Sequence, residues 1–380
     1  MKYVQINAYG YGSTGSIMRN IHKERLRDGD ESYIAWARGP ASQESNEYRF
    51  GTKFDVYMHV GLHRLFGMGG FMGSKRATEQ LVSWLEGIDP DVVHLHNLHG
   101  YTIHLPVLFD FLKRAGKQVV WTLHDCWAFT GHCGHFSHAR CSQWKMRCGA
   151  SCVCPQAHEN PKTLAGTWAV RRSFDIKRDL FTSLHDVEII VPSQWLAHLV
   201  SQSYLSKYPI QVVPHKVDSN VFKATQSGFR EQYGLEGKVI ILGVASPWSR
   251  HKGLERFVSL SNLLDERFAI VLVGLTDKQQ SYVQKSCNSQ VAIVSLSSVS
   301  EASKLAQIYS ASDYYWNAST EETFGMTTLE AVSCGAFSIV CEGTPGEEII
   351  SAETGVALPA NASAVAEYVL KNQAPRKEYV

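Results

Sequence analysis

The chain lacks long apolar runs. No window approaches the ~18 consecutive apolar residues that a membrane-spanning helix needs, and residues 1–7 have the pattern of a short strand, with no apolar signal-peptide region. We therefore expect a cytoplasmic protein, with any membrane contact peripheral and at the inner face of the cell membrane.

An excess of charge of one sign is also missing. Lys and Arg number 37 and Asp and Glu number 36, so the formal net charge is +1. Without an overall field, the composition excludes electrostatic recognition of nucleic acid as a main function, and we expect no nucleic-acid partner. The 380 residues exceed what one hydrophobic core usually spans, which predicts two domains.

Cysteine is present but unevenly spread, with six of the nine residues between Cys126 and Cys154. Because a cytosolic chain keeps its thiols reduced, this cluster favours metal binding or loop packing over disulfides. Cys148 and Cys152 have the spacing of half a structural zinc site, whereas Cys133 and Cys141 are more widely spaced. Structural zinc and packed reduced thiols both remain open, and no thiol has the marks of an activated nucleophile.

Apolar runs alternate with amphipathic stretches along the whole chain, which predicts βαβ units, parallel sheets and an α/β fold. The expected strands are Tyr3–Ile6, Val92–Leu95, Val119–Leu123, Val187–Val191, Val239–Val244, Ala269–Val273, Ala292–Val294, Tyr314–Trp316 and Ser338–Cys341. The expected helices include Ser16–Leu26, Thr78–Leu85, Leu105–Arg114, Leu254–Leu264 and Ala302–Ala311.

The alternation is interrupted twice. Residues 125–160 form a Cys/His/Gly-rich insertion without periodicity, and residues 206–237 are rich in turn signals. We therefore expect an N-terminal domain at 1–205, a C-terminal domain at 206–362 and a final helical segment at 363–380.

A glycine-rich turn follows the first strand. Gly10, Gly12 and Gly15 have the G-x-G-x-x-G spacing, which lets backbone approach a phosphate at a helix start. The rest of a dinucleotide fingerprint is missing, because Glu31 begins the second strand and no acidic residue ends it. A dinucleotide-dependent dehydrogenase is therefore excluded as the leading hypothesis.

Histidines end two of the central strands, where side chains face the ligand crevice of a parallel sheet. We interpret His94 as a core histidine, because it shares a strand face with His96. His96 and Asn97 lie at the predicted lip, and His124, followed by Asp125, ends the next strand. A purely structural role for the His-Asp pair stays open.

The acidic pair Asp89 and Asp91 has the Asp-x-Asp pattern of metal-dependent sugar transfer. It precedes a buried strand and flanks a proline, so we interpret it as a turn and expect no metal site there.

A second group of polar residues follows two strands of the C-terminal half. Arg250 and Lys252 lie in a loop after Val239–Val244, where cations can pair with a phosphate. Glu322 precedes the helix start at Phe324-Gly325-Met326, whose free N–H groups suit a phosphate or sugar oxygen. Glu330 follows roughly 9 Å along that helix at ~1.5 Å per residue. Solvated turns and a helix-capping glutamate are the alternatives.

The stretch 61–76 interleaves glycine with basic and bulky apolar residues. A lipid surface or an acceptor could contact it, and a mobile helix–loop–helix connection would have the same composition.

The ordered set of motifs resembles the retaining glycosyltransferases of family 4, which have the GT-B fold of two Rossmann-like domains. Glu322 to Glu330 is similar to the E-x₇-E motif of that family. The segments Gly12–Gly15, His124-Asp125, Pro192–Trp195 and Lys252-Gly253 occur in the order in which the family has them. The Asn-Leu-His-Gly, Thr-Leu-His-Asp-Cys-Trp and cysteine segments resemble bacterial members that build capsule, exopolysaccharide and O-antigen repeats.

This resemblance implies a role for each matching residue. Glu322 would contact hydroxyls of the transferred sugar and Glu330 the ribose of a nucleoside diphosphate sugar. His124 would lie beside the reacting centre, with His96 and Asn97 on the acceptor side. The expected phosphate contacts are Gly15, Lys252 and the backbone at Phe324, Gly325 and Met326.

The sequence departs from the family pattern in three places. The family has an Arg several residues before the Lys, where this chain has Ser246-Pro247-Trp248, and Arg250 is a substitute out of register. The usual Pro-Asn-Gly-Val-Asp turn is here Pro214–Asp218, and little chain follows the helix expected at Ser363–Leu370.

We therefore expect a retaining, metal-independent hexosyltransferase acting on a glycan acceptor, with a lipid-linked repeat unit as the expected substrate and no cofactor. A nucleotide-sugar epimerase of the same architecture and a zinc-stapled binding module without catalysis are the alternatives.

Overall fold

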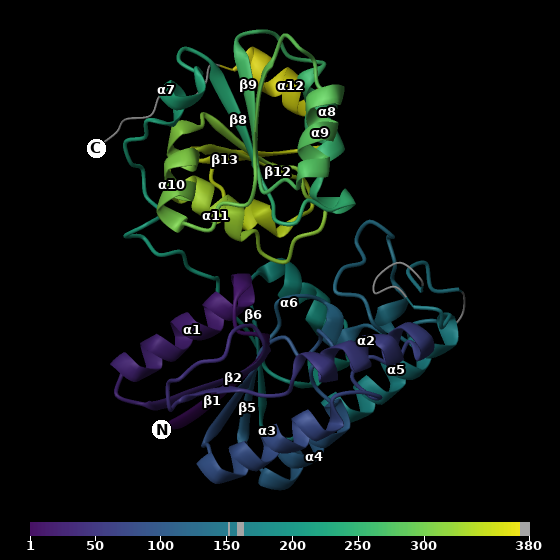
Figure 1. The fold of residues 1–380 in the computed structure, drawn as a ribbon. Coiled ribbons are helices and arrows are strands. Elements are labelled where there is room, and N and C mark those ends of the chain that lie inside the picture. Colours follow the sequence, from purple (N-terminus) through teal and green to yellow (C-terminus); the bar gives the residue numbers. More distant parts are fainter. Residues whose placement is uncertain (151–152, 158–162, 373–380) are drawn as a thin grey trace. The chain divides into compact units, whose positions relative to one another are not determined.

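Two parallel sheets organise the chain, one in each of two units, Met1–Pro214 and His215–Val380 (Figure 1). The structure is a computed structural model that describes residues 1–150, 153–157 and 163–372, with only the backbone at Arg250. The boundary expected at 205/206 falls a little earlier than this division, because Ile210–Val212 pairs with Val187–Val191 in the first sheet.

The first unit is a seven-stranded sheet in the order β3-β2-β1-β4-β5-β6-β7, with parallel pairing throughout. Its strands are β1 (Lys2–Tyr9), β2 (Glu31–Arg38), β3 (Glu47–Arg49), β4 (Val92–Leu95), β5 (Gln118–Thr122), β6 (Val187–Val191) and β7 (Ile210–Val212). Its helices are α1 (Gly12–Arg27), α2 (Lys53–Phe66), α3 (Lys75–Ile88), α4 (Leu105–Ala115), α5 (Thr167–Phe181) and α6 (Gln194–Ser201), with 3₁₀ turns η1 (Trp127–Phe129), η2 (Gln143–Lys145) and η3 (Tyr204–Lys207).

The second unit is a six-stranded parallel sheet in the order β10-β9-β8-β11-β12-β13. Its strands are β8 (Val239–Val244), β9 (Phe268–Val273), β10 (Ala292–Leu296), β11 (Tyr314–Asn317), β12 (Phe337–Cys341) and β13 (Gly355–Leu358). Its helices are α7 (Phe229–Tyr233), α8 (Leu254–Ser261), α9 (Asp277–Ser286), α10 (Ala302–Ala311), α11 (Met326–Ser333) and α12 (Ala362–Lys371), with 3₁₀ turns η4 (Arg250–Lys252) and η5 (Pro345–Glu348).

The central strands form because both of their faces are covered. Strands β4 and β9 are buried at every position, as continuous apolar runs predict for a parallel sheet flanked by helices. Helix α3 shows the matching helical pattern, since Ala77, Leu81 and Leu85 recur at helical spacing and are buried. Each strand predicted from an apolar run is present, within three residues at its ends.

The C-terminal helix belongs to the second unit. Helix α12 contacts α8, and Val365, Ala366 and Val369 are buried in the core around β8 and β9. Residues 373–380, the rest of the segment expected at 363–380, lie outside the described residues. Among the described helices, none is both long and apolar enough to cross a lipid bilayer.

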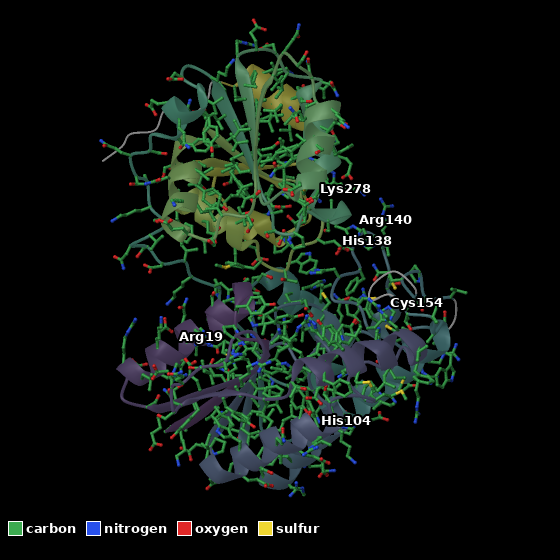
Figure 2. The ribbon with its side chains drawn as sticks, in the orientation of Figure 1. Arg19, His104, His138, Arg140, Cys154 and Lys278 are labelled. Carbon is green, nitrogen blue, oxygen red and sulfur yellow. The ribbon has the colours of Figure 1, made fainter. Side chains whose placement is uncertain are left out.

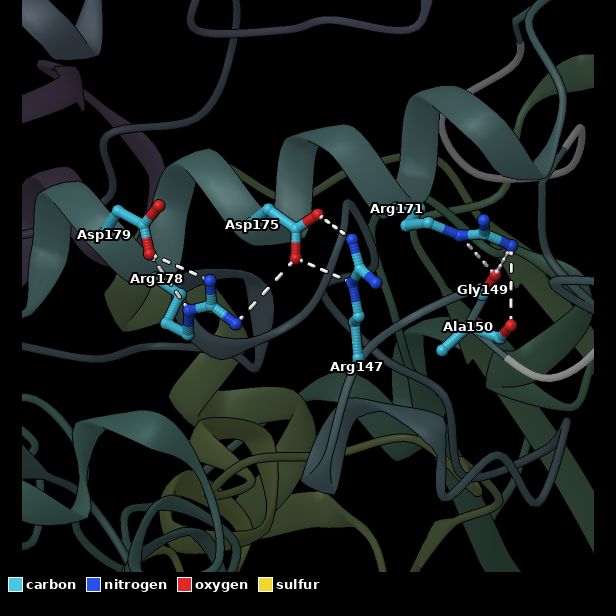
Figure 3. Close-up of polar contacts among 7 residues, drawn as sticks. All are labelled: Arg147, Gly149, Ala150, Arg171, Asp175, Arg178 and Asp179. Atoms are coloured by element: carbon cyan, nitrogen blue, oxygen red, sulfur yellow. Dashed lines mark hydrogen bonds and ion pairs between the residues drawn. The ribbon is translucent and has the colours of Figure 1, made fainter.

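Ion pairs and hydrogen bonds fasten the cysteine-rich insertion to α5 (Figure 3). Arg147 donates from Nε and Nη2 to the two oxygens of the Asp175 carboxylate, at 2.8 and 2.5 Å, in the fork geometry that arginine favours. Arg171 donates to the carbonyl oxygen of Gly149. The insertion is therefore part of the first unit, held by polar contacts on one side of α5.

The cysteines of this insertion act on one another. Cys154 (Figure 2) accepts a hydrogen bond from the Cys133 thiol, which lowers the pKa of Cys154 below its ordinary value. The Gly131 N–H donates to Cys148 Sγ at 3.2 Å, while burial raises the pKa of Cys148 to about 12. Among the described residues, no three cysteine sulfurs lie within 4.8 Å of one another. Cys152, half of the expected zinc spacing, lies outside the described residues.

The acidic pair lies in the short connection between α3 and β4. Asp91 Oδ2 accepts from the backbone N–H of Lys2 at 2.8 Å, and Asp89 pairs with Lys117 at 2.9 Å. Both carboxylates therefore have structural partners.

Candidate functional site

The strand order places one crevice in each unit. In the second sheet β8 and β11 are neighbours, and the chain leaves β8 toward β9 but leaves β11 toward β12. In the first sheet β1 and β4 are related in the same way. Ligands of open parallel sheets bind beyond the carboxyl ends of the strands at such switch points. The loops after these four strands are therefore the places to look for a site.

In the second unit, the loops after β8 and β11 bring Lys252 and Glu322 together. The Thr320 N–H donates to the His251 carbonyl oxygen at 3.3 Å, and Arg256 donates to the carbonyl oxygen of Ala318. Lys252 Nζ lies 2.6 Å from Glu322 Oε1, with 35% of the lysine side chain and 15% of the glutamate side chain exposed. The pair is thus accessible, and its two charges are already matched.

The start of α11 offers backbone N–H groups beside this pair. Gly325 precedes the helix with a φ of 108°, a left-handed conformation that glycine adopts easily. Among the described residues no side chain caps this helix start and no acidic residue lies in its first turn. The positive end of α11 is therefore open to an anion. Phe324 is buried, with its ring 5.3 Å from that of His215, while Met326 is half-buried.

Glu330 lies on the second turn of α11, half-buried against α10. Its Oε2 accepts from the Tyr309 hydroxyl at 2.9 Å. Burial raises the pKa of Glu330 to about 7, and the hydrogen bond from Tyr309 opposes that rise only partly. Glu330 therefore changes charge near neutral pH. Arg250 lies in η4, and its side chain is outside the described residues.

In the first unit, three stacked imidazoles lie at the carboxyl ends of β4 and β5. His94 bonds Thr122 Oγ1 at 2.8 Å, and its burial lowers its pKa to about 3. This confirms its interpretation as a satisfied core histidine. His96 is 1% exposed and its Nδ1 lies 3.0 Å from His124 Nε2. His124 is 9% exposed, and Asn97 is half-buried.

The amide of Gln5 sets the protonation pattern of this row. The Gln5 side-chain oxygen accepts from the backbone N–H of His22 at 3.1 Å, so the Gln5 side-chain nitrogen faces His96 Nε2, also at 3.1 Å. A neutral His96 that accepts at Nε2 carries its proton on Nδ1 and donates it to His124 Nε2. The chain of bonds therefore holds the His124 ring in one orientation.

A more exposed ion pair lies next to this row. His99 Nε2 is 2.7 Å from Asp125 Oδ2, and the Trp127 N–H donates to the other oxygen of Asp125 at 2.8 Å. Burial alone would raise the pKa of Asp125, but the charge and hydrogen bond of His99 outweigh it and hold that pKa below its ordinary range. The carboxylate orients the His99 ring, whose side chain is 31% exposed.

The His99–Asp125 pair lines a cavity of about 290 Å³ that lies within the first unit. Aromatic rings and imidazoles share its wall, and these include Tyr9, His59, His63, Tyr101, Trp127 and His132. Among the described residues neither ring nitrogen of His63 has a hydrogen-bond partner, although His63 is 3% exposed. Such a wall suits a ligand that has both apolar faces and hydroxyl groups.

Gly15 lies in the first turn of α1, where it is buried. A Cβ at this position would come within 2.8 Å of the backbone carbonyl carbon of Gly10. The absence of a side chain thus lets α1 begin close to the turn after β1. Its expected contact with a phosphate remains a prediction.

Several residues in these sites were not singled out from the sequence. His99 follows β4 as Asp125 follows β5, so the meeting of neighbouring strand ends was the available signal. Tyr309 lies in the last turn of a predicted helix, and nothing local in the sequence marks it as the partner of Glu330. His63 lies on the buried face of α2, where periodicity indicates burial but not a cavity.

Comparisons with known proteins relate this chain to glycosyl transferases. The family model "Glycosyl transferases group 1" matches residues 237–372, most of the second unit. WcaC of Escherichia coli (strain K12), whose name describes a glycosyl transferase of colanic acid biosynthesis, is 25% identical over 222 residues. That alignment covers 54% of this chain and 52% of WcaC, so the chain spans about half the length of this curated relative.

Solved structures share the fold over nearly the whole chain. Sucrose-phosphate synthase from Thermosynechococcus elongatus has a TM-score of 0.68 at 15% identity, covering 97% of this chain and 88% of that one. Anabaena Alr3699/HepE in complex with UDP-glucose has a TM-score of 0.64 at 15% identity, covering 98% and 89%. These similarities confirm the expected architecture of two Rossmann-like units, the GT-B fold.

Proposed function

We propose that this chain, whose residues 237–372 match the group 1 glycosyl transferases, transfers a hexose from a nucleoside diphosphate sugar to a hydroxyl of a glycan. The observation that carries this proposal is the Lys252–Glu322 pair beside the uncapped start of α11. A cation, a carboxylate and free backbone N–H groups at one switch point match the phosphates and hydroxyls of such a donor. The UDP-glucose complex of the Anabaena neighbour supports a nucleotide sugar as the donor.

Donor binding exchanges one set of contacts for another. Lys252 leaves Glu322 and turns to the diphosphate, which frees the Glu322 carboxylate to accept from hydroxyls of the hexose. Until the donor replaces that contact, the two charges neutralise each other. Glu330 accepts from the ribose, and Phe324, Gly325 and Met326 provide the backbone around sugar and phosphate.

We propose that transfer retains the anomeric configuration and uses no metal ion. The acceptor oxygen forms a bond to the anomeric carbon on the face from which the diphosphate departs, as the bond from carbon to phosphate oxygen breaks. The acceptor proton passes to that phosphate oxygen. Lys252 and the positive end of α11 stabilise the departing negative charge.

The acceptor is proposed to be a lipid-linked glycan of bacterial surface polysaccharide synthesis, bound at the inner face of the cell membrane. The similarity to WcaC supports this substrate class. His124 would lie at the reacting centre, with His96 and Asn97 behind it on the acceptor side. The cavity beside His99 and Asp125 has the mixed aromatic and polar wall that a sugar ring requires.

The donor site is tested by titrating UDP and GDP into three variants by calorimetry. Removing a charge-assisted contact costs about 1.5–3 kcal/mol, so Lys252→Met should weaken nucleoside diphosphate binding about 10- to 100-fold. Lys278→Met is the matched control, since Lys278 is an exposed lysine of the same unit on α9.

The double variant Lys252→Met, Glu322→Gln separates two causes of that loss. If the unpaired Glu322 of the single variant repels the diphosphate, the double variant should recover part of the affinity. Wild-type affinity for both nucleotides in Lys252→Met would contradict the proposed donor site. Release of an epimerised sugar from donor alone, without acceptor, would contradict transfer and favour an epimerase.

A further inference from the structure

Helix α2 has its polar and apolar faces reversed for a helix of a water-soluble domain. The residues that it buries against the rest of the unit are His59 and His63. Its outer face instead carries Phe54 at 70% exposure, Tyr57 at 72% and Leu65 at 57%. A surface helix normally buries its apolar stripe and exposes its polar one. The apolar residues of α2 therefore need a partner outside this unit.

Four of the five exposed bulky apolar residues of α2 form one stripe, and the fifth, Phe66 at 46%, lies outside it. The stripe consists of Phe54, Tyr57, Met58 and Leu65. Successive members differ by three, one and seven positions, which places them on one face of a helix. All four side chains are exposed to solvent, and Met58, at 49%, is the most covered of them.

The stripe continues onto the start of α5. The Leu164 N–H donates to the Arg64 carbonyl oxygen at 2.7 Å, so this segment lies against the end of α2 (Figure 1). Leu164 is 79% exposed and Trp168, in the first turn of α5, is 68% exposed. The outer face, here defined as Phe54, Tyr57, Met58, Leu65, Leu164 and Trp168, is larger than the isolated apolar residues found on most protein surfaces.

Among the described residues of α2 and the start of α5, the exposed charges beside this outer face are basic. Lys53 and Arg64 are exposed on α2, and Arg172 is exposed one turn after Trp168 on α5. The one acid of α2, Asp55, is committed to the helix start, where it accepts from the Thr52 N–H at 2.8 Å and from the Thr52 hydroxyl at 2.6 Å. Cations beside an apolar stripe complement the anionic headgroups and acyl boundary of a lipid bilayer.

We propose that this outer face docks on an anionic lipid bilayer, with α2 lying in the plane of the interface. Phe54, Tyr57 and Leu65 enter the acyl boundary, and Lys53, Arg64 and Arg172 contact the headgroups. A second copy of the chain fits this face less well, because a two-fold contact would bring the same cations of both copies together. That the docked protein acts on a lipid-linked acceptor rests on the proposed function, whereas bilayer docking itself can be measured without any sugar transfer.

Co-sedimentation with vesicles tests the proposal on the full chain. Wild-type protein should pellet with phosphatidylcholine vesicles that contain phosphatidylglycerol, and much less with pure phosphatidylcholine. The variant Phe54→Gln, Tyr57→Gln, Leu65→Gln keeps helix propensity and should partition about tenfold more weakly. Lys53→Gln with Arg64→Gln should lose only the part of binding that depends on phosphatidylglycerol.

Matched controls keep the result specific. Tyr233→Gln with Tyr282→Gln removes exposed aromatic residues of the second unit and should leave vesicle binding at the wild-type level. A thermal-shift response to UDP and GDP that is unchanged in the triple variant would show an intact donor site. Loss of vesicle binding could then be told apart from failure of the proposed donor site. Equal pelleting of wild type and triple variant would overturn the proposal. So would lipid-free self-association in sedimentation velocity that the triple variant abolishes, since the face would then join two copies.

Discussion

At the scale of single residues, burial decides which acids in the second unit can respond to pH. Glu322 keeps a lysine partner, whereas Glu330 has a neutral one, the Tyr309 hydroxyl. Because a buried carboxylate without a cation is disfavoured, the pKa of Glu330 rises from 4.5 to about 7. The two glutamates of one motif therefore have different tasks in the unliganded protein.

Replacing Glu330 by Gln should flatten the pH dependence of stability. The folded-state pKa of about 7 lies above the unfolded value of 4.5, so the folded state binds more protons between these values. The free energy of unfolding of the wild type should thus fall as pH rises from 4.5 to 7, by up to about 3 kcal/mol. Urea unfolding at pH 5 and pH 8 should show this fall in the wild type and a smaller one in Glu330→Gln.

The exposed Glu353 provides the control for that measurement. Glu353→Gln should keep the wild-type profile. Parallel profiles of wild type and Glu330→Gln would show that Glu330 is ionised in the folded state throughout this range. Weaker UDP or GDP binding by Glu330→Gln, with stability retained, would further support the expected ribose contact.

Residue identity was easier to predict than residue geometry in the candidate sites. The two segments that contain His96 and His99, and His124 and Asp125, are visible in the sequence, as is their place at strand ends. Which of these side chains reaches a cavity depends on how two loops fold after β4 and β5. His96 was expected at the lip and is 1% exposed, while His99 has 31% of its side chain exposed. Neighbouring positions in a loop can point in opposite directions, and periodicity carries no information about them.

At the scale of elements, apolar pattern predicted the central strands but missed one buried strand and three short edge strands. The missed buried strand is β2, although Glu31 was identified as its start, and the edge strands β3, β7 and β13 have three or four residues and are mostly half-buried. Their edge positions leave few apolar residues to signal them. The cysteine-rich insertion was also beyond prediction, because its place depends on ion pairs such as Arg147–Asp175 with a helix formed later in the chain.

Helix α5 contains a fully buried lysine beneath that insertion, and its charge should cost stability. Lys177 donates to the Trp127 carbonyl oxygen at 2.5 Å, with its Nζ 3.9 Å from the centre of the Trp127 ring. Burial nevertheless lowers its pKa from 10.5 to about 7. The unfolded state therefore binds more protons between pH 7 and 10.5, so stability should rise with pH across this window and the cost should be complete below pH 7.

Lys177→Met should remove that slope and stabilise the protein at pH 7 by about 1–3 kcal/mol. The Trp127 carbonyl oxygen keeps a partner in the variant, since the Thr130 N–H also donates to it at 3.3 Å. Chemical denaturation at pH 7, 8 and 9 measures the effect as a difference from the wild type, which cancels the shared titration of the cysteines. Lys207→Met is the control, because this exposed lysine also donates to a carbonyl, that of Thr182, at 2.7 Å. A larger loss of stability in Lys177→Met than in Lys207→Met would contradict the prediction.

At the scale of the whole molecule, the two units have separate hydrophobic cores. Buried apolar residues of the first unit form a core that runs from Val4 to Tyr208, and those of the second unit pack on the two faces of its own sheet. Regions with separate cores can unfold with separate free energies. Because the proposed donor contacts of Lys252, Glu322 and Glu330 all lie in the second unit, a nucleoside diphosphate should stabilise mainly that unit.

Hydrogen exchange with and without UDP or GDP can measure that difference in one experiment. A ligand at about 100 times its Kd adds about 2.7 kcal/mol to the state that binds it. Amides of β8, β9 and β11 that exchange by unfolding of the second unit should thus slow about 100-fold with the matching nucleotide. Amides of β4 and β5 should exchange at unchanged rates, while slowing confined to the start of α1 would support the expected phosphate contact of Gly15. Equal protection of both sheets would mean that the nucleotide stabilises both units together, which would contradict a donor site built by the second unit.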